Sequence, residues 1–107
     1  MGMKQSLDVT ERQRQELFMI LETYLPDTEV WAFGSRIKGA ARPVSDLDLV
    51  AFASGKQRSN IAELREAFDE SDLPFRVDLH IWNELPESFH KNIEIEYVPL
   101  QKTAANN

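Results

Sequence analysis

The stretch FGSRIKGAARPVSDLDL, residues 33–49, decides how this sequence is interpreted, because it joins glycines, basic side chains and aspartates directly behind an apolar run that ends at Phe33. Its first part contains no acidic residue and three cations, namely Arg36, Lys38 and Arg42. Its last part carries the pair Asp46 and Asp48. Because the whole chain has a formal net charge of −6, this local gathering of positive charge needs a specific explanation.

The end of this stretch predicts a β-strand, because SDLDLVAFA, residues 45–53, has a period of two that places Asp46, Asp48, Val50 and Phe52 on one face. Asp46 and Asp48 leave the same face of such a strand, with Cα atoms about 6.5 to 7 Å apart. The opposite face carries Leu47, Leu49, Ala51 and Ala53. The strand therefore separates an apolar face from a face with two carboxylates.

Patterns on either side of this strand predict a small sheet domain. Runs of β-branched and aromatic residues predict two further strands, over residues 28–33 and 75–82. Helical spacing and capping residues predict helices over residues 10–25, 36–41, 61–71 and 85–92. The run IEIEYVPL, residues 93–100, fits either a helix end or a short strand. Helices that alternate with three strands indicate an α/β or α+β domain.

The composition is that of one folded domain. The chain has 107 residues, is 42% hydrophobic and contains no cysteine, which excludes a disulfide framework and a Cys-based zinc site. We expect a flexible N-terminus (1–9), the domain itself (10–100) and a frayed tail (101–107). The acidic balance disfavours direct nucleic-acid binding, and no apolar run approaches the roughly 18 to 20 residues that span a bilayer. We therefore expect a cytoplasmic protein without membrane contact.

Gly34 and Ser35 stand where a strand ends and a short helix begins. Backbone N–H groups and the helix dipole favour an anion at such a position. Glycine lets the backbone approach a phosphate closely, and Gly39, one turn further on, allows a second close approach. Neither the P-loop pattern nor the dinucleotide pattern G-x-G-x-x-G is present. Taken alone, a Gly-Ser pair after a strand is a turn in most proteins.

The paired carboxylates point to a cation. Two carboxylates about 4 Å apart repel by about 4 kcal/mol at an effective dielectric constant of about 20, so such a pair needs a raised pKa or a counter-ion. Mg²⁺ is the expected ion, because one or two carboxylates and substrate phosphates hold it. Asp78 would join the pair if its strand lies beside theirs, and three such carboxylates can hold two metal ions for phosphoryl displacement. An isolated Asp-x-Asp pair, in contrast, is usually solvent-facing.

Together these residues resemble the minimal nucleotidyltransferase family, small members of the DNA polymerase beta-like superfamily. The family pattern is Gly-Ser, Arg-x-[Arg/Lys]-Gly, Ser-Asp-x-Asp-[Leu/Ile] and a later acidic residue. The matching positions here are Gly34, Ser35, Arg36, Lys38, Gly39, Ser45, Asp46, Asp48, Leu49 and Asp78. Lys38 stands where arginine is common, and Ile37 where a small residue is common. The resemblance covers about residues 10–100 and implies a small mixed sheet of three or more strands, with helices packed mainly on one face.

The resemblance also implies a reaction, in which AMP passes from ATP, or another NMP from its NTP, to a hydroxyl and pyrophosphate is released. It implies that the catalytic and metal-binding residues, holding two Mg²⁺ ions, are Asp46, Asp48 and Asp78. It implies that the nucleotide-binding residues are Gly34, Ser35, Arg36, Lys38, Gly39 and Ser45. In this scheme Gly34 and Ser35 hold the β and γ phosphates, and Arg36 or Lys38 neutralises developing charge.

Minimal members of this family often pair with a HEPN-domain ribonuclease toxin and act as its antitoxin, in several cases by adenylylating a toxin tyrosine. The resemblance therefore implies a HEPN toxin as partner. The alternative is a non-catalytic antitoxin or nucleotide-sensing regulatory subunit that neutralises its partner by contact. The intact aspartates favour the enzyme. So small a sheet domain is expected to cover an apolar face in a homodimer or a hetero-oligomer.

Several other residues fit both a structural and a functional interpretation. His80 shares a face with Asp78, although a strand histidine is more often packed or hydrogen-bonded. His90 is expected on a helix surface. Trp31 and Phe33 are able to stack on a base, but aromatic residues in a sheet are more often part of the core. The acidic positions Glu84, Glu87, Glu94 and Glu96 form either a solvated face or a surface complementary to a basic partner.

Overall fold

A computed structural model of the protein describes residues 7–37 and 45–102. The helices are α1 (Glu11–Tyr24), α2 (Ile61–Asp69) and α3 (Glu87–Ile95). The strands are β1 (Val30–Phe33), β2 (Leu47–Ala51), β3 (Val77–Ile81) and β4 (Val98–Gln101). Short 3₁₀ helices, η1 (Ser35–Ile37), η2 (Gly55–Asn60) and η3 (Trp82–Glu84), join them. No helix in the described ranges has the length and apolar character needed to cross a membrane.

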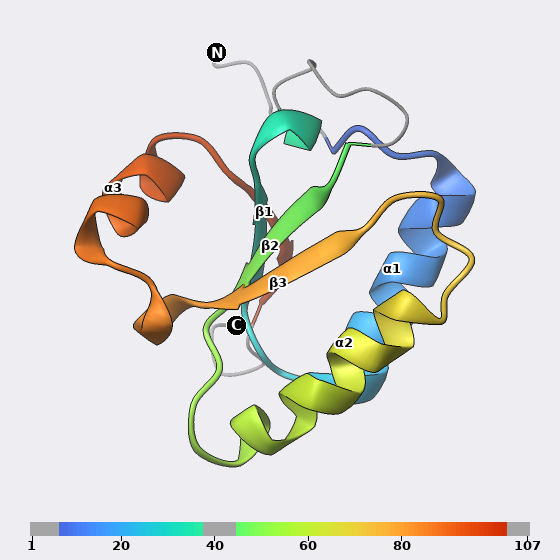
Figure 1. Cartoon of the computed structure of the whole chain (residues 1–107), viewed down its shortest axis with the longest axis horizontal. Helices are drawn as coiled ribbons and strands as arrows, with labels where there is room; N and C mark the ends of the chain where they lie inside the picture. The colour runs from blue at the N-terminus through green and yellow to red at the C-terminus, as the bar shows by residue number, and fades with distance from the viewer. Residues whose placement is uncertain (1–6, 38–44, 103–107) are drawn as a thin grey trace.

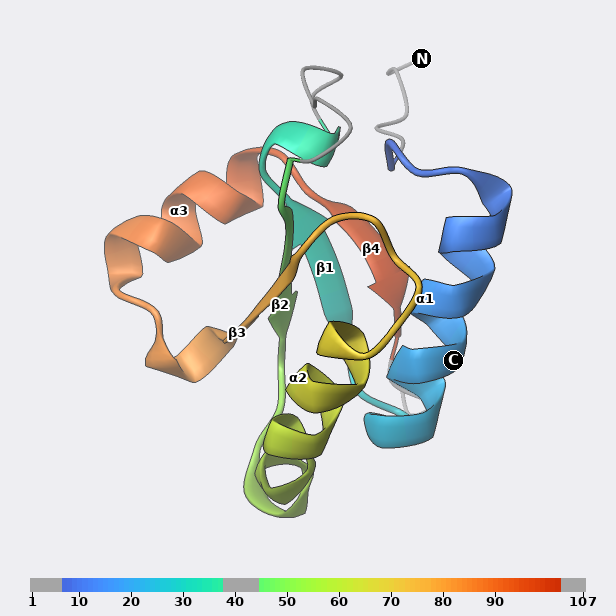
Figure 2. The same cartoon turned by 45° about the vertical axis from the view of Figure 1, so that its right-hand side comes forward.

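The four strands form one mixed sheet in the order β3-β2-β1-β4. Strand β2 runs parallel to β3, whereas β1 pairs antiparallel with both β2 and β4. Helices α1 and α2 cover one face of this sheet, and α3 lies on the opposite side (Figures 1 and 2). The predicted fold class is confirmed, and the ambiguous run near the C-terminus forms both the end of α3 and β4.

The alternation along β2 explains the position of the core. Leu47, Leu49 and Ala51 are fully buried in the same cluster as the α1 residues Leu17 and Leu21. Burying a leucine side chain fully stabilises the fold by about 1.5 to 3 kcal/mol. The predicted division of β2 into two faces is therefore confirmed, and the aspartate face is directed away from α1 and α2.

Helix α1 begins where the capping residues predict. The Thr10 hydroxyl accepts a hydrogen bond from the Gln13 backbone N–H at 3.1 Å, and the Gln13 side chain accepts one from the Thr10 N–H at 2.9 Å. This reciprocal capping box satisfies two N–H groups that lack partners within the helix. The helix ends at Tyr24, immediately before the buried Leu25, and Asp27 follows with a φ of 58°.

Residues near both ends of the chain pack against the domain, although the sequence predicts that they lie in flexible segments. Leu7 and Val9, placed in the flexible N-terminus by the sequence analysis, pack against the core. Gln101, predicted to start the frayed tail, ends β4 and donates from its side chain to the Leu25 carbonyl at 2.6 Å and to the Thr28 carbonyl at 2.8 Å. The remainder of the two predicted end segments, residues 1–6 and 103–107, lies outside the described residues.

Candidate functional site

The parallel pairing of β2 with β3 brings two of the predicted carboxylates together. Asp48 lies directly opposite Asp78 in the register, and Val50 lies opposite His80. One potential ligand atom from each of Asp48, Asp78 and His80 lies within 4.8 Å of the others. His80 Nε2 is 3.8 Å from Asp78 Oδ2. The sheet therefore builds a compact group of two carboxylates and one imidazole on the face directed away from α1 and α2.

Asp46, the other predicted carboxylate, lies at the edge of this group. It is exposed and precedes the first residue of β2, so the strand does not fix its side chain as firmly as that of Asp48. It is not among the clustered ligand atoms described above. Its charge nevertheless reaches Asp48, because Asp46 contributes to the pKa of the Asp48 carboxyl.

Asp48 is the residue whose electrostatics the site changes. Burial of its carboxyl raises the pKa above the ordinary value of 3.8, and the negative charge of Asp78 raises it further. His80 acts in the opposite direction, and Asp46 adds a smaller increase. Within residues 7–37 and 45–102, His80 is the one group whose charge lowers the pKa of this half-buried carboxyl. A cationic ligand bound there would relieve this repulsion.

The raised pKa of Asp48 predicts a pH-dependent loss of stability. Because the folded state binds this proton more tightly than the unfolded state, stability falls as pH rises from about 3.8 through the higher pKa of the folded protein. We expect Asp48→Asn to raise the Tm by a few degrees at neutral pH in a chelating buffer, and to have little effect on the Tm below the ordinary pKa. Thermal melts at both pH values measure the difference; a Tm gain independent of pH would contradict this origin.

Gly34 connects the end of β1 to this group. Its φ of 90° lies in the region that favours glycine, and a Cβ built on it would lie 2.5 Å from Asp48 Oδ2. Phe33, the preceding residue, pairs with Asp48 across the β1–β2 ladder. The Asp48 carboxylate therefore occupies space that a side chain at position 34 would fill.

Arg36, one of the predicted nucleotide-binding residues, has a buried side chain with an exposed fraction of 4%. Its Nε donates to the Ser45 carbonyl at 2.9 Å and its Nη1 donates to the Asp8 carbonyl at 2.7 Å. Its guanidinium carbon lies 4.0 Å from the centre of the Phe75 ring. Arg36 therefore joins the segment before α1 to the chain just ahead of β2. The predicted residues Lys38 and Gly39 lie outside the described residues.

These contacts predict a stability role for Arg36 that charge alone does not supply. Lysine keeps the charge, but its single ammonium lacks the planar fork that bonds two carbonyls and stacks on Phe75. We expect Arg36→Lys to lower the free energy of unfolding by about 2 kcal/mol. Urea denaturation measures this loss. The control is Arg58→Lys at an exposed ion pair with Glu84, where a change within about 0.5 kcal/mol is expected; equal losses at both positions would contradict the assignment.

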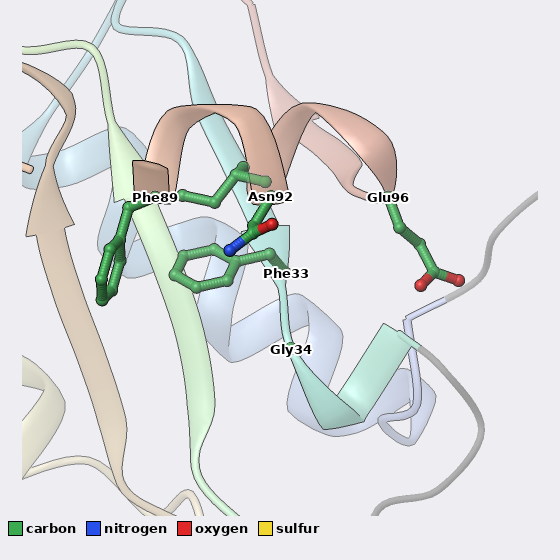
Figure 3. Close-up of a pocket in the computed structure, with 6 residues that line it drawn as sticks. Phe33, Gly34, Phe89, Asn92 and Glu96 are labelled. Carbon is green, nitrogen blue, oxygen red and sulfur yellow. The ribbon is translucent and has the colours of Figure 1, made fainter. Parts of the chain in front are cut away.

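A cavity lies beside Gly34, between the end of β1 and helix α3 (Figure 3). Its volume is about 180 Å³, and it is lined by Phe33, Gly34, Phe89, Asn92, Ile93 and Glu96. Sequence reasoning singled out Phe33 as able to stack on a base and Gly34 as a phosphate ligand, but it missed the residues at and after the end of α3 as a set. Their spacing was the available signal, because positions 89, 92 and 93 share one face of a helix and Glu96 follows at the C-cap of this helix.

A second group of aromatic residues packs together near α3 and contains Trp31, Phe52, Trp82, His90 and Tyr97. Trp31 stacks on Tyr97 with ring centres 3.8 Å apart, and Trp82 stacks on His90 at 3.9 Å. His90 Nε2 also lies 2.6 Å from the Trp82 carbonyl oxygen, so His90 is not the helix-surface residue that the sequence predicts. The structural interpretation of Trp31 is supported, whereas Phe33 reaches the cavity.

Comparisons with known proteins agree with this architecture. The sequence matches the family described as "Nucleotidyltransferase domain" over residues 14–100. It is 45% identical over 98 residues to a Haemophilus influenzae protein named probable protein adenylyltransferase MntA, covering 90% of this chain and 85% of that protein. A solved toxin–antitoxin complex with AMP-PNP aligns with a TM-score of 0.69 at 20% identity, covering 87% of this chain and 76% of that chain.

A second solved structure gives a similar result. It contains a tri-AMPylated HEPN toxin of Shewanella oneidensis in complex with an MNT antitoxin, and it aligns with a TM-score of 0.53 at 16% identity. The alignment covers 90% of this chain and 75% of that chain. At these identities, the solved structures report on the fold alone.

Proposed function

Because the chain belongs to the nucleotidyltransferase domain family, we propose that it transfers AMP from ATP to a hydroxyl of a partner protein and releases pyrophosphate. The observation that carries this proposal is the pairing of Asp48 with Asp78 on adjacent parallel strands, beside the glycine that ends β1. The proposed catalytic domain spans residues 10–100, with Asp46, Asp48 and Asp78 as its acidic residues.

The donor set suits Mg²⁺, the ion proposed here. Asp48 and Asp78 supply carboxylate oxygens, the ligands that Mg²⁺ prefers, and the raised pKa of Asp48 indicates a site that a cation stabilises. Asp46 and Asp48 would hold an ion on the triphosphate, and Asp48 and Asp78 a second ion. Bound Mg²⁺ supplies positive charge that offsets the charge developing on the phosphates.

The residues of this chain then have separate roles in the transfer. The acceptor oxygen attacks the α-phosphorus, and the bond from this phosphorus to its bridging oxygen breaks, so that pyrophosphate leaves with the electron pair. Asp78 Oδ2 takes the proton of the acceptor hydroxyl; its side chain is 45% exposed and therefore open to an incoming group. Gly34 and Ser35 orient the phosphates, while Arg36 holds Ser45 at the start of the acidic segment.

We further propose that the acceptor is a tyrosine of a HEPN-domain toxin and that this chain acts as the antitoxin. The name of the curated relative supports a protein as the acceptor. The solved complex of similar fold with a tri-AMPylated HEPN toxin is consistent with it. A complex of the two proteins would also bring the acceptor hydroxyl to the site.

The test is to incubate the purified protein with ATP, Mg²⁺ and a HEPN-domain toxin. Intact-mass spectrometry is expected to detect AMP added to the toxin, on tyrosine after peptide mapping, and RNA cleavage by the toxin is expected to fall as modification proceeds. The control is Asp48→Asn together with Asp78→Asn. If this double variant modifies the toxin as the wild type does, the catalytic assignment is wrong. If it silences the toxin without modifying it, contact alone suffices for the antitoxin action.

A further inference from the structure

We propose that the cavity between β1 and α3 is the subsite for the adenine base of the nucleotide. This inference rests on the proposed function, and it assigns to α3 a role in nucleotide selection. Its lining residues Phe33, Phe89, Asn92 and Glu96 supply apolar walls and polar groups in one place. Figure 3 shows the side chain of Asn92 next to the Phe33 ring, with Phe89 and Glu96 on either side.

The position of the cavity connects it to the proposed phosphate and metal site. Gly34 is part of the cavity wall, and the same residue lies against Asp48, where an added Cβ would meet the Asp48 carboxylate at 2.5 Å. Phe33, the other β1 residue of the wall, pairs with Asp48 across the sheet. A ligand whose phosphates lie at Asp48 therefore has this cavity directly beside it.

The size and apolar character of the cavity suit a flat ring. Its volume is about 180 Å³, which exceeds the roughly 150 Å³ of a protein cavity that accommodates benzene. Phe33 and Phe89 present aromatic surface, on which a base stacks favourably. Phe89 is 47% exposed despite its apolar ring, so a stacked base would remove apolar surface from water.

The polar groups of the cavity suit adenine more than phosphate. A side-chain amide bonds adenine at N6 and N7 with one acceptor and one donor, and within the described residues the Asn92 amide makes no hydrogen bond of its own. Glu96 places a carboxylate at the same cavity, which repels phosphate but accepts a hydrogen bond from an amine or a ribose hydroxyl.

The proposed tyrosine acceptor fits this cavity less well. Its hydroxyl must reach the α-phosphorus, and its ring has no other polar edge for the Asn92 amide. The base, in contrast, is the part of ATP that does not react and carries both a donor and an acceptor on one edge. We therefore assign the cavity to the base, and the acceptor becomes an outcome that the experiment distinguishes.

The experiment is isothermal titration in the presence of Mg²⁺ with two separate probes. The first probe is ATP, and the second is inorganic tripolyphosphate, which lacks the base and the sugar. We expect Asn92→Ala and Phe89→Ala each to weaken ATP binding about tenfold, equivalent to about 1.4 kcal/mol, and to leave tripolyphosphate binding within about twofold. The matched controls are Asn83→Ala and Ile95→Ala, at exposed positions outside the cavity lining, which are expected to leave both affinities unchanged. Thermal melts verify that each variant is folded.

Several results would overturn the assignment. Unchanged ATP affinity in Asn92→Ala and Phe89→Ala places the base elsewhere, and equal losses for ATP and tripolyphosphate mean that the cavity does not distinguish the base. An unchanged ATP affinity with a raised KM for the toxin assigns the cavity to the acceptor. The titrations measure the binding of ATP and tripolyphosphate without any transfer. A failure of the proposed transferase activity is therefore detected separately, in the assay of AMP transfer to the toxin. Binding of neither probe to the wild-type protein rejects both proposals.

Discussion

Replacing Asp48 by asparagine is expected to reduce AMP transfer by more than about 100-fold while the protein stays folded. Mutations of groups that merely support metal ligands already cost about 10- to 100-fold, and Asp48 is central to the proposed site, since it faces Asp78 in the register and feels the charge of Asp46. Asparagine keeps the shape of the side chain but removes its charge. Initial rates of AMP incorporation into the acceptor measure the loss.

The matched control for Asp48→Asn is Glu22→Gln on the exposed surface of α1, which removes one negative charge on the other side of the sheet. We expect its transfer rate to equal that of the wild type. Asp48→Asn should change activity and stability in opposite directions, because the variant should lose AMP transfer and gain thermal stability at neutral pH. A variant that transfers AMP at the wild-type rate would remove Asp48 from the reaction.

Gly34→Ala is expected to lose most of the transfer activity, because the added methyl group clashes with the Asp48 carboxylate. The added Cβ would lie 2.5 Å from Asp48 Oδ2, so either the carboxylate or the end of β1 must move. A displacement of about 1 Å in a catalytic group can cost about 100-fold in rate. The side chain also has to adopt a φ of 90°, which strains any residue other than glycine.

Gly55→Ala separates these two causes. Gly55 has a φ of 57°, but a Cβ added to it would meet no atom of the described residues within 4 Å beyond its own chain neighbours. Both alanine variants should therefore lose stability, by about 1 to 2 kcal/mol for a left-handed conformation, whereas only Gly34→Ala should lose transfer activity. Denaturation curves and transfer rates measured on both proteins make the comparison. Equal activity losses would show that general destabilisation, and not the contact with Asp48, explains the effect.

The β2 strand shows how much of this site local sequence can predict. Its alternation places Asp48 on the face opposite Leu47 and Leu49, because the side-chain period of a strand leaves no other arrangement. The meeting of Asp48 with Asp78 was predictable only on the condition that β2 and β3 are neighbours. The order of strands depends on packing between distant segments, which periodicity within one segment does not encode.

Arg36 and α3 show where local sequence falls short. Arg36 lies in a basic stretch that suggests a phosphate ligand, and its partners include the Asp8 and Ser45 carbonyls and the Phe75 ring, contacts that this stretch does not predict. The α3 residues of the cavity share a helix face, but nothing local indicates that this face is opposite Phe33 and Gly34. Long-range packing decides both cases.

The central claim is that this protein transfers a nucleotidyl group, and the position of the transferred phosphorus tests it most directly. Parallel reactions with ATP labelled at the α-phosphate or at the γ-phosphate, each with Mg²⁺ and the toxin, follow the two ends of the triphosphate. We predict that α-label becomes covalently bound to the toxin, that γ-label is released as pyrophosphate, and that Asp48→Asn abolishes the labelling. Label on the toxin from γ-labelled ATP, or none from either nucleotide, would contradict the account.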